Sequence, residues 1–165
     1  MSTSHALLDS PLGPLVVVAS DGQLRGLYFH DQRHLPSPEH LGPRGADVLP
    51  ALCEQLGGYF AGELTTFDVP LPATGTPFQR DVWAALRDVP YGSTCSYAEL
   101  ARAVGRPAAV RAVGAANGRN PVCIVVPCHR VVGSSGSLTG YAGGLSRKRR
   151  LLAHERRVRE QPPSG

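Results

Sequence analysis

The stretch "IVVPCHRVV" places a thiol, an imidazole and a guanidinium, those of Cys128, His129 and Arg130, between two apolar runs. A cysteine reacts as a nucleophile in its thiolate form, and an imidazole is a suitable base for the thiol proton. Neighbouring side chains point about 100° apart on a helix and to opposite faces of a strand, so the imidazole would act through a bridging water. The motif therefore fits nucleophilic catalysis, and an inert buried cysteine beside a core histidine is the alternative.

The other uses of cysteine fit this chain less well. The four cysteines are Cys53, Cys95, Cys123 and Cys128 in 165 residues, and the N-terminus has no basic-then-apolar signal pattern, so we expect reduced thiols and a cytoplasmic location. A zinc site would need a second Cys or His pair at ligand spacing, which is missing. Peptidase dyads join residues that are far apart in sequence, so the adjacency of Cys128 and His129 argues against a peptidase.

Charge divides the chain near residue 75. Residues 1–75 carry three arginines and eight acidic residues, net −5, whereas residues 76–165 carry fourteen basic and five acidic residues, net +9. The second part has the balance of a polyanion-binding domain. Half of its basic residues lie in 147–150 and 156–159, however, and these would also fit the solvated face of a last helix.

The first part reads as a small sheet with one helix. We expect a hairpin with strands over 15–20 and 24–29 and an Asp21-Gly22 turn, a helix over 47–60 with Val48, Leu52 and Leu56 on one face, and another strand over 66–71. None of these residues forms a catalytic motif.

The second part reads as mainly helical. Thr76-Pro77 is a good helix start, and Phe78, Val82, Trp83 and Leu86 repeat on one helical face. Ser96 and Glu99 form a capping box for a short helix to about residue 104.

A break at Gly105-Arg106-Pro107 and a further helix over 108–117 complete the outline of a helix-turn-helix. We expect that second helix to bury Val110 and Val113 and to expose alanines and one long side chain, Arg111. A helix with so few long polar side chains can contact few base edges in the major groove. It would fit a narrow minor groove, with Arg111 inserted as a probe. Close packing between helices would explain the small residues equally well.

The stretch "NPVCIVVPCHRVVGSSGSLTGYAGGLSRKRRLLAHE" resembles the active-site region of the O6-alkylguanine-DNA alkyltransferases. Their signature is Pro-Cys-His-Arg between apolar residues, with Asn-Pro upstream and Tyr-x-Gly-Gly and Leu-x-x-His-Glu downstream. The similarity covers about residues 76–156, and the part before it is similar only in length and outline. It implies an α/β protein with a small ribonuclease-H-like N-terminal domain (1–75) and a helical, winged-helix-like C-terminal domain with the helix-turn-helix (76–165).

The resemblance also implies a function. Cys128 would accept the alkyl group of an O6-alkylguanine, and less well of O4-methylthymine, from double-stranded DNA in one irreversible transfer that needs no cofactor. His129 would be the base, Glu155 would orient the imidazole, and Asn120 would position the active-site segment. Some relatives carry zinc in the N-terminal domain, but Cys53 is the only cysteine before Cys95, so we expect no metal.

Further roles follow from the same resemblance, because the guanine must leave the helix to reach a buried thiol. Tyr97 would turn the nucleotide and donate a proton, Arg111 would fill the vacated place, and Ala109 and Ser134 would contact DNA. The base pocket would consist of Tyr141, Ala142, Gly143 and Val131, with the carbonyls of Cys128 and Val131 receiving the guanine amino group. Position 142 departs from the serine of many members, which puts the handling of bulky adducts in doubt.

Three other functions stay open at this point. The first is a DNA-binding protein that recognises alkylguanine without accepting the alkyl group, the second a transcription regulator, and the third a thiol hydrolase. We expect a monomer in solution, and whether it binds DNA cooperatively is left open.

Overall fold

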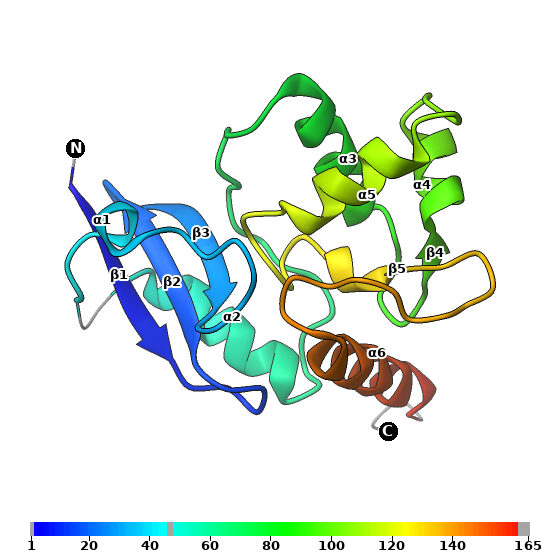
Figure 1. The fold of residues 1–165 in the computed structure, drawn as a ribbon. Coiled ribbons are helices and arrows are strands. Elements are labelled where there is room, and N and C mark those ends of the chain that lie inside the picture. The colour runs from blue at the N-terminus through cyan, green and yellow to red at the C-terminus, as the bar shows by residue number, and fades with distance from the viewer. Residues whose placement is uncertain (1, 46–47, 162–165) are drawn as a thin grey trace. The chain divides into compact units, whose positions relative to one another are not determined.

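The computed structural model describes residues 2–45 and 48–161, and the chain forms two compact units (Figure 1). One unit contains the chain up to Thr74 together with Pro121–Val125, and the other contains Gly75–Asn120 and the chain from Val126 onward. The short segment Pro121–Val125 thus belongs to the first unit, although the chain on both sides of it belongs to the second. No helix of the described ranges is long and apolar enough to cross a membrane.

The first unit is built on a three-stranded antiparallel sheet in the order β1 (Thr3–Leu8), β2 (Leu15–Ser20) and β3 (Gln23–Phe29). The central strand β2 is buried along its whole length. Asp21 and Gly22 have φ values of 53° and 76°, as a two-residue hairpin turn requires, so the predicted hairpin is confirmed. The sequence did not indicate β1, because only Ala6 of this edge strand is buried.

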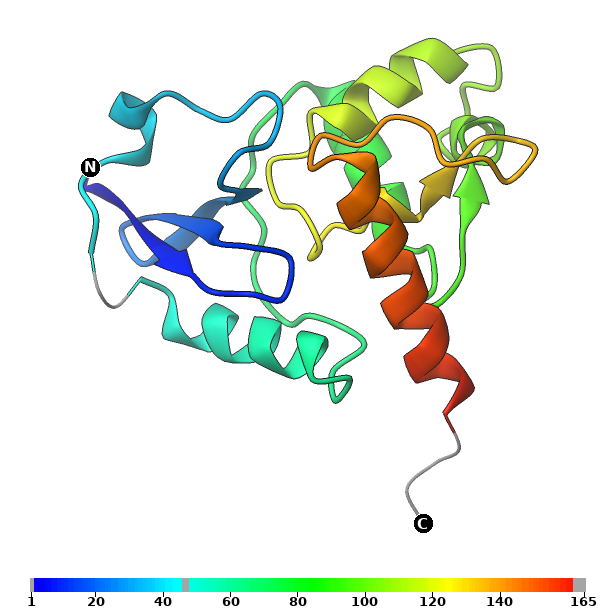
Figure 2. The same ribbon diagram turned by 60° about the horizontal axis from the view of Figure 1, so that its bottom comes forward.

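Helix α2 (Pro50–Phe60) runs along one face of this sheet (Figure 2) and buries Leu52, Leu56 and Tyr59. It begins three residues later than the predicted start at Asp47, which lies outside the described residues, because proline stands at its first position. The preceding Pro- and Gly-rich connection contains one short helix, α1 (Pro38–Leu41).

The predicted strand over 66–71 is wrong, since the chain there is irregular. The side-chain amide of Gln55 takes the place of a neighbouring strand: the Asp68 N–H donates to Gln55 Oε1 at 2.8 Å, and Gln55 Nε2 donates to the Asp68 carbonyl at 3.1 Å. Pro70 and Pro72 have no N–H to give to a sheet.

The free side of β3 is paired by the segment that leads to Cys128. The Leu27 N–H donates to the Pro121 carbonyl at 2.8 Å, and the Cys123 N–H donates to the Leu27 carbonyl at 3.1 Å. A tight three-residue turn follows at Ile124, where φ is +71° and the Val125 N–H donates to the Cys123 carbonyl at 2.7 Å. The N-terminal sheet therefore holds residues 121–125 as part of its own unit.

The second unit is mainly helical, as predicted. Its elements are α3 (Pro77–Arg87), β4 (Cys95–Ser96), α4 (Tyr97–Ala103), α5 (Val110–Gly118), the 3-10 turn η1 (Cys128–Arg130), β5 (Val131–Val132) and α6 (Leu145–Glu160). Capping boxes start α3, through Thr76 and Gln79, and α4, through Ser96 and Glu99. Trp83 Nε1 donates to the Ala116 carbonyl at 2.8 Å and ties α3 to α5, while β4 and β5 form a short parallel pair.

Helices α4 and α5 pack on each other across the predicted break and form the helix-turn-helix (Figure 1). One detail of the prediction is wrong, because Val110 is 37% exposed. It is the first residue of α5 and lies one turn ahead of Val113, which is fully buried.

Candidate active site

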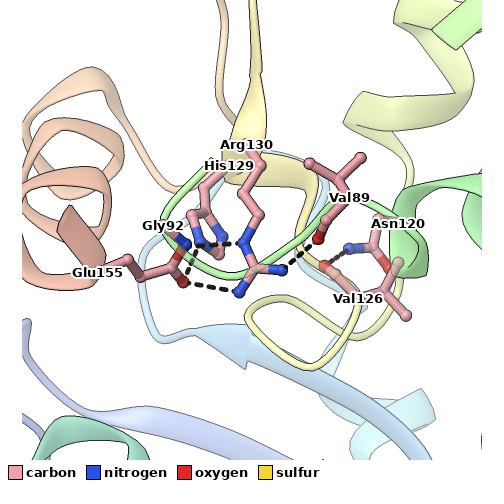
Figure 3. A network of polar contacts seen from close by, with 7 residues as sticks. All are labelled: Val89, Gly92, Asn120, Val126, His129, Arg130 and Glu155. Atoms are coloured by element: carbon pink, nitrogen blue, oxygen red, sulfur yellow. Dashed lines mark hydrogen bonds and ion pairs between the residues drawn. The ribbon is translucent and has the colours of Figure 1, made fainter. Parts of the chain in front are cut away.

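Cys128 lies in the 3-10 turn η1 and not in a strand. The turn is tightened at Pro127, where the Cys128 N–H donates to the Val126 carbonyl at 2.8 Å. Asn120 Nδ2 donates to the same carbonyl, also at 2.8 Å (Figure 3). Two hydrogen bonds therefore hold the Val126 carbonyl, two residues before the thiol. The Cys128 side chain is buried.

His129, Arg130 and Glu155 form a buried polar network (Figure 3). His129 Nε2 lies 2.7 Å from Glu155 Oε2, Arg130 Nε donates to Oε1 at 2.8 Å, and Arg130 Nη2 donates to Oε2 at 3.1 Å. Because a carboxylate only accepts, the neutral imidazole carries its proton on Nε2. Among the described residues, the buried Nδ1 has no hydrogen-bond partner, so this nitrogen is the one available as a base.

Arg130 has a structural place in this network. Its Nη1 donates to the Val89 carbonyl at 2.7 Å, and its guanidinium lies 5.5 Å from the centre of the Tyr91 ring. The Gly92 N–H adds a long contact of 3.5 Å to Glu155 Oε1. The loop after α3 is thus tied to η1 and α6 around one carboxylate.

Burial and hydrogen bonding set the protonation states of the three groups. Burial alone would raise the pKa of the Glu155 carboxyl, but the charges and hydrogen bonds of His129 and Arg130 outweigh it and hold that pKa well below its usual range. Burial lowers the pKa of His129 and raises the pKa of the Cys128 thiol. At neutral pH the thiol is therefore protonated and the imidazole neutral, which is the arrangement that a base-activated nucleophile needs.

Lys148 was missed by the sequence analysis. It is fully buried on α6, and its Nζ donates to the carbonyls of Thr139 at 2.7 Å and Gly140 at 3.4 Å. Burial lowers its pKa to about 8, and its charge acts against the raised pKa of Cys128. Helical spacing could have found it, since Lys148 stands three, four and seven residues before Leu151, Leu152 and Glu155 on the buried face of α6.

The predicted pocket residues lie around the loop between β5 and α6. Val131, Tyr141 and Gly143 are buried, and Ala142 is half-buried. The side chains of Asn120 and Tyr141 and the charge of Lys148 all oppose the rise in the pKa of the Cys128 thiol. Asn120, Tyr141 and Lys148 thus act on the Cys128 thiol, and the next residue, His129, is held by Glu155.

The predicted DNA contacts lie farther out. Arg111 is exposed on α5, Ala109 caps the start of that helix, and Ser134 is exposed in the loop after β5. Tyr97 is half-buried at the start of α4, and its hydroxyl accepts a hydrogen bond from Thr139 Oγ1 at 3.3 Å. No described hydrogen bond joins these four residues to Cys128.

The four cysteines, all within the described residues, form no disulfide. Within residues 2–45 and 48–161, no group of three or more His, Cys, Asp or Glu side chains is arranged to hold a metal ion.

The fold and the site define a helix-turn-helix protein with a buried thiol beside a histidine–glutamate pair. The family model of the 6-O-methylguanine DNA methyltransferase DNA-binding domain matches residues 77–157, and that of the ribonuclease-like domain of the same proteins matches residues 4–73. The chain belongs to this family.

Individual relatives agree with this assignment. The methylated-DNA–protein-cysteine methyltransferase of Mycolicibacterium paratuberculosis is 54% identical over 155 residues, which cover 93% of this chain and 92% of that protein. The crystal structure of the Mycobacterium tuberculosis O6-methylguanine methyltransferase is 48% identical, with a TM-score of 0.89 over 98% of this chain and 96% of that one. The Mycobacterium tuberculosis OGT in complex with DNA is also 48% identical, with a TM-score of 0.88 over 94% of each chain.

Proposed function

We propose that this protein repairs DNA directly, as a methylated-DNA–protein-cysteine methyltransferase that moves the alkyl group of O6-alkylguanine to Cys128. The observation that carries the proposal is the buried thiol in η1 followed by a neutral imidazole that is oriented by Glu155. Relatives that cover nine-tenths of the chain at about half identity bear the same name, and one close structural relative was solved with DNA.

The chemistry is a single displacement at carbon. Nδ1 of His129 accepts the thiol proton through a bridging water, and Glu155 stabilises the imidazolium that forms. The thiolate attacks the alkyl carbon, the new S–C bond forms as the C–O6 bond breaks, and the released electron pair leaves as the O6 anion of guanine. A proton restores the neutral base, and Tyr97 is our candidate donor. The thioether is stable, so each molecule reacts once.

The substrate reaches the thiol by leaving the base stack, which costs a few kcal/mol. In our proposal Arg111 fills the vacated place, Ala109 and Ser134 contact the backbone, and Tyr97 crowds the phosphate to turn the nucleotide. Exposure of Arg111 on a helix of small residues supports this role. A duplex substrate, a monomeric protein, a cytoplasmic location and the domain boundary at residue 75 belong to the same proposal.

Tyr141, Ala142, Gly143 and Val131 form the base pocket in this proposal. Their position supports it, because the loop that carries Tyr141 is held to α6 by Lys148 and to α4 by the contact between Thr139 and Tyr97. Ala142 has no hydroxyl for O6, so backbone N–H groups of the loop would hold that oxygen. Activity on O4-methylthymine would be weaker.

Mass spectrometry of the protein after mixing with duplex DNA that contains one O6-methylguanine tests the proposal. We expect one added methyl on the peptide that bears Cys128, saturating at one per protein, and none with Cys128→Ser. Tight binding without added mass would favour the non-transferring DNA-binding alternative. Turnover of a small ester or peptide that is lost in Cys128→Ser would instead indicate a thiol hydrolase.

A further inference from the structure

Three contacts fix the position of the Tyr97 side chain at the start of α4. The capping box of Ser96 and Glu99 fixes its backbone, since Tyr97 is the first residue of the helix. Gly114 of α5 lies under one edge of its ring: a Cβ there would be 3.7 Å from Cδ1 and 3.8 Å from Cε1, in ordinary contact. The third contact is at the hydroxyl, which accepts a hydrogen bond from Thr139 Oγ1 at 3.3 Å. The phenol therefore has a defined place between α5 and the loop after β5.

Thr139 is anchored independently of its side chain. Its carbonyl accepts a hydrogen bond from Nζ of Lys148 at 2.7 Å, and the Lys148 side chain is fully buried on α6. Hydrogen bonds from a charged donor are short and about twice as strong as those between neutral groups. The hydroxyl of Thr139 is thus attached to a fixed backbone, two residues before Tyr141, which is proposed to pack against the base.

The direction of the hydrogen bond decides what the Tyr97 oxygen can do. A phenol has one hydrogen to donate, and its oxygen can also accept. Because Thr139 donates, the hydroxyl hydrogen of Tyr97 points away from Thr139 and stays available to another acceptor. Hydrogen bonds in a chain also polarise one another, so a hydroxyl that accepts one bond becomes a better donor in the next.

The departing guanine is the acceptor that the transfer reaction supplies. Breaking the C–O6 bond leaves an electron pair on the guanine, and that anion must gain a proton to become a normal base. When Tyr97 gives its proton, the negative charge moves to the phenolate oxygen, and the hydrogen bond from Thr139 strengthens because its acceptor is now charged. Tyr97 is only half-buried, so water can return a proton to the phenolate afterwards.

We propose that Thr139 is a positioning residue of the transfer reaction, whose hydroxyl directs the Tyr97 proton toward the departing guanine and stabilises the phenolate that forms. This inference rests on the proposed function and deepens it. It assigns the orientation of the proton donor to a side chain that belongs neither to the reactive motif nor to the helix-turn-helix.

A double-mutant cycle between Thr139 and Tyr97 tests the inference. The measured quantity is the single-turnover rate of methyl transfer from duplex DNA with one O6-methylguanine, at protein concentrations that saturate the DNA. Thr139→Val keeps the shape of the side chain but removes the hydroxyl, and we expect it to slow transfer about three- to tenfold. Thr139→Ser keeps a hydroxyl and should restore most of the rate. In a Tyr97→Phe background, Thr139→Val should cause no further loss.

Ser135→Ala is the matched control. Ser135 Oγ donates to Ser137 Oγ at 3.3 Å, so this change removes a hydroxyl–hydroxyl bond of the same length from the same loop without touching the one to Tyr97. We expect Ser135→Ala to transfer at the rate of the parent protein.

An equal loss from Thr139→Val with and without Tyr97→Phe would overturn the inference, because a purely structural role of the loop predicts that result. An unchanged rate in Thr139→Val, a loss in Thr139→Ser as large as in Thr139→Val, or a Tyr97→Phe variant as fast as the parent would overturn it as well. The proposed function fails separately: if the parent protein moves no methyl group to Cys128, the transfer itself is wrong and the role of Thr139 falls with it.

Discussion

At the scale of single residues, the site keeps the thiol of Cys128 protonated in the resting protein. Burial raises the pKa of Cys128 and lowers that of His129, so neither group is charged in the resting protein. Glu155 stays ionised because Arg130 and His129 donate to it. In the proposed mechanism, ionisation of the thiol therefore depends on proton transfer to His129.

The pH dependence of transfer to free O6-benzylguanine checks this. The base must be neutral, and its pKa lies below the usual value of about 6.5, so we expect a rate that is flat near neutrality and falls only in more acidic solution. His129→Ala should slow transfer about 10²–10⁴-fold at pH 7, and its rate should rise about tenfold per pH unit as the raised pKa of Cys128 is approached.

His129→Gln is the matched control, because its amide can still donate to Glu155 and preserve the buried network. It should behave like His129→Ala in rate and pH profile while melting close to the parent protein. A flat profile in His129→Ala would exclude the imidazole as the base.

At the scale of elements, helix α5 has one face buried in its unit and one face exposed. Its inner face carries Val113 and Asn117 against the rest of the unit, and Trp83 holds its last turn. Its outer face exposes Val110, Arg111 and small residues. In the proposed function, this division separates the face that contacts DNA from the face that supports the reactive turn.

Arg111→Ala should therefore slow repair in duplex DNA and spare the reaction with free O6-benzylguanine, which needs no base flipping. Rates on both substrates measure this, with Arg119→Ala, an exposed arginine at the end of the same helix, as the control for loss of one positive charge. Equal slowing on both substrates would mean that Arg111 supports the fold or the thiol.

At the scale of the whole molecule, the charge is strongly uneven, with net −5 before residue 76 and net +9 after it. A phosphate backbone is attracted to the second part and repelled by the first, although the net charge of the chain is only +4. The asymmetry favours docking of DNA on the helical unit.

Binding of duplex DNA should consequently weaken steeply with salt, by orders of magnitude between about 50 and 200 mM if about six or more phosphates are contacted. Titrations of Cys128→Ser at several salt concentrations measure this without consumption of the substrate by transfer. An affinity that stays constant over that range would contradict binding through phosphate contacts.

The sequence by itself determined the hairpin, the capped starts of α3 and α4 and the reactive motif, because each depends on neighbours within a few residues. Asp21-Gly22 sets its turn by local φ preference, and Ser96 and Glu99 satisfy each other's backbone donors. The Pro-Cys-His-Arg signature carried the family in the same way, since its residues are consecutive.

Only the tertiary structure decided what depends on distant partners. The irregular chain at 66–71 follows from Gln55, the edge strand β1 from its pairing with β2, and the buried charge of Lys148 from carbonyls of a loop. The carbonyl of Val126 is held by Asn120, and Cys123 is paired with Leu27, which lies almost a hundred residues earlier in the chain. Such contacts join segments that fold together only when the core forms, so no local pattern records them.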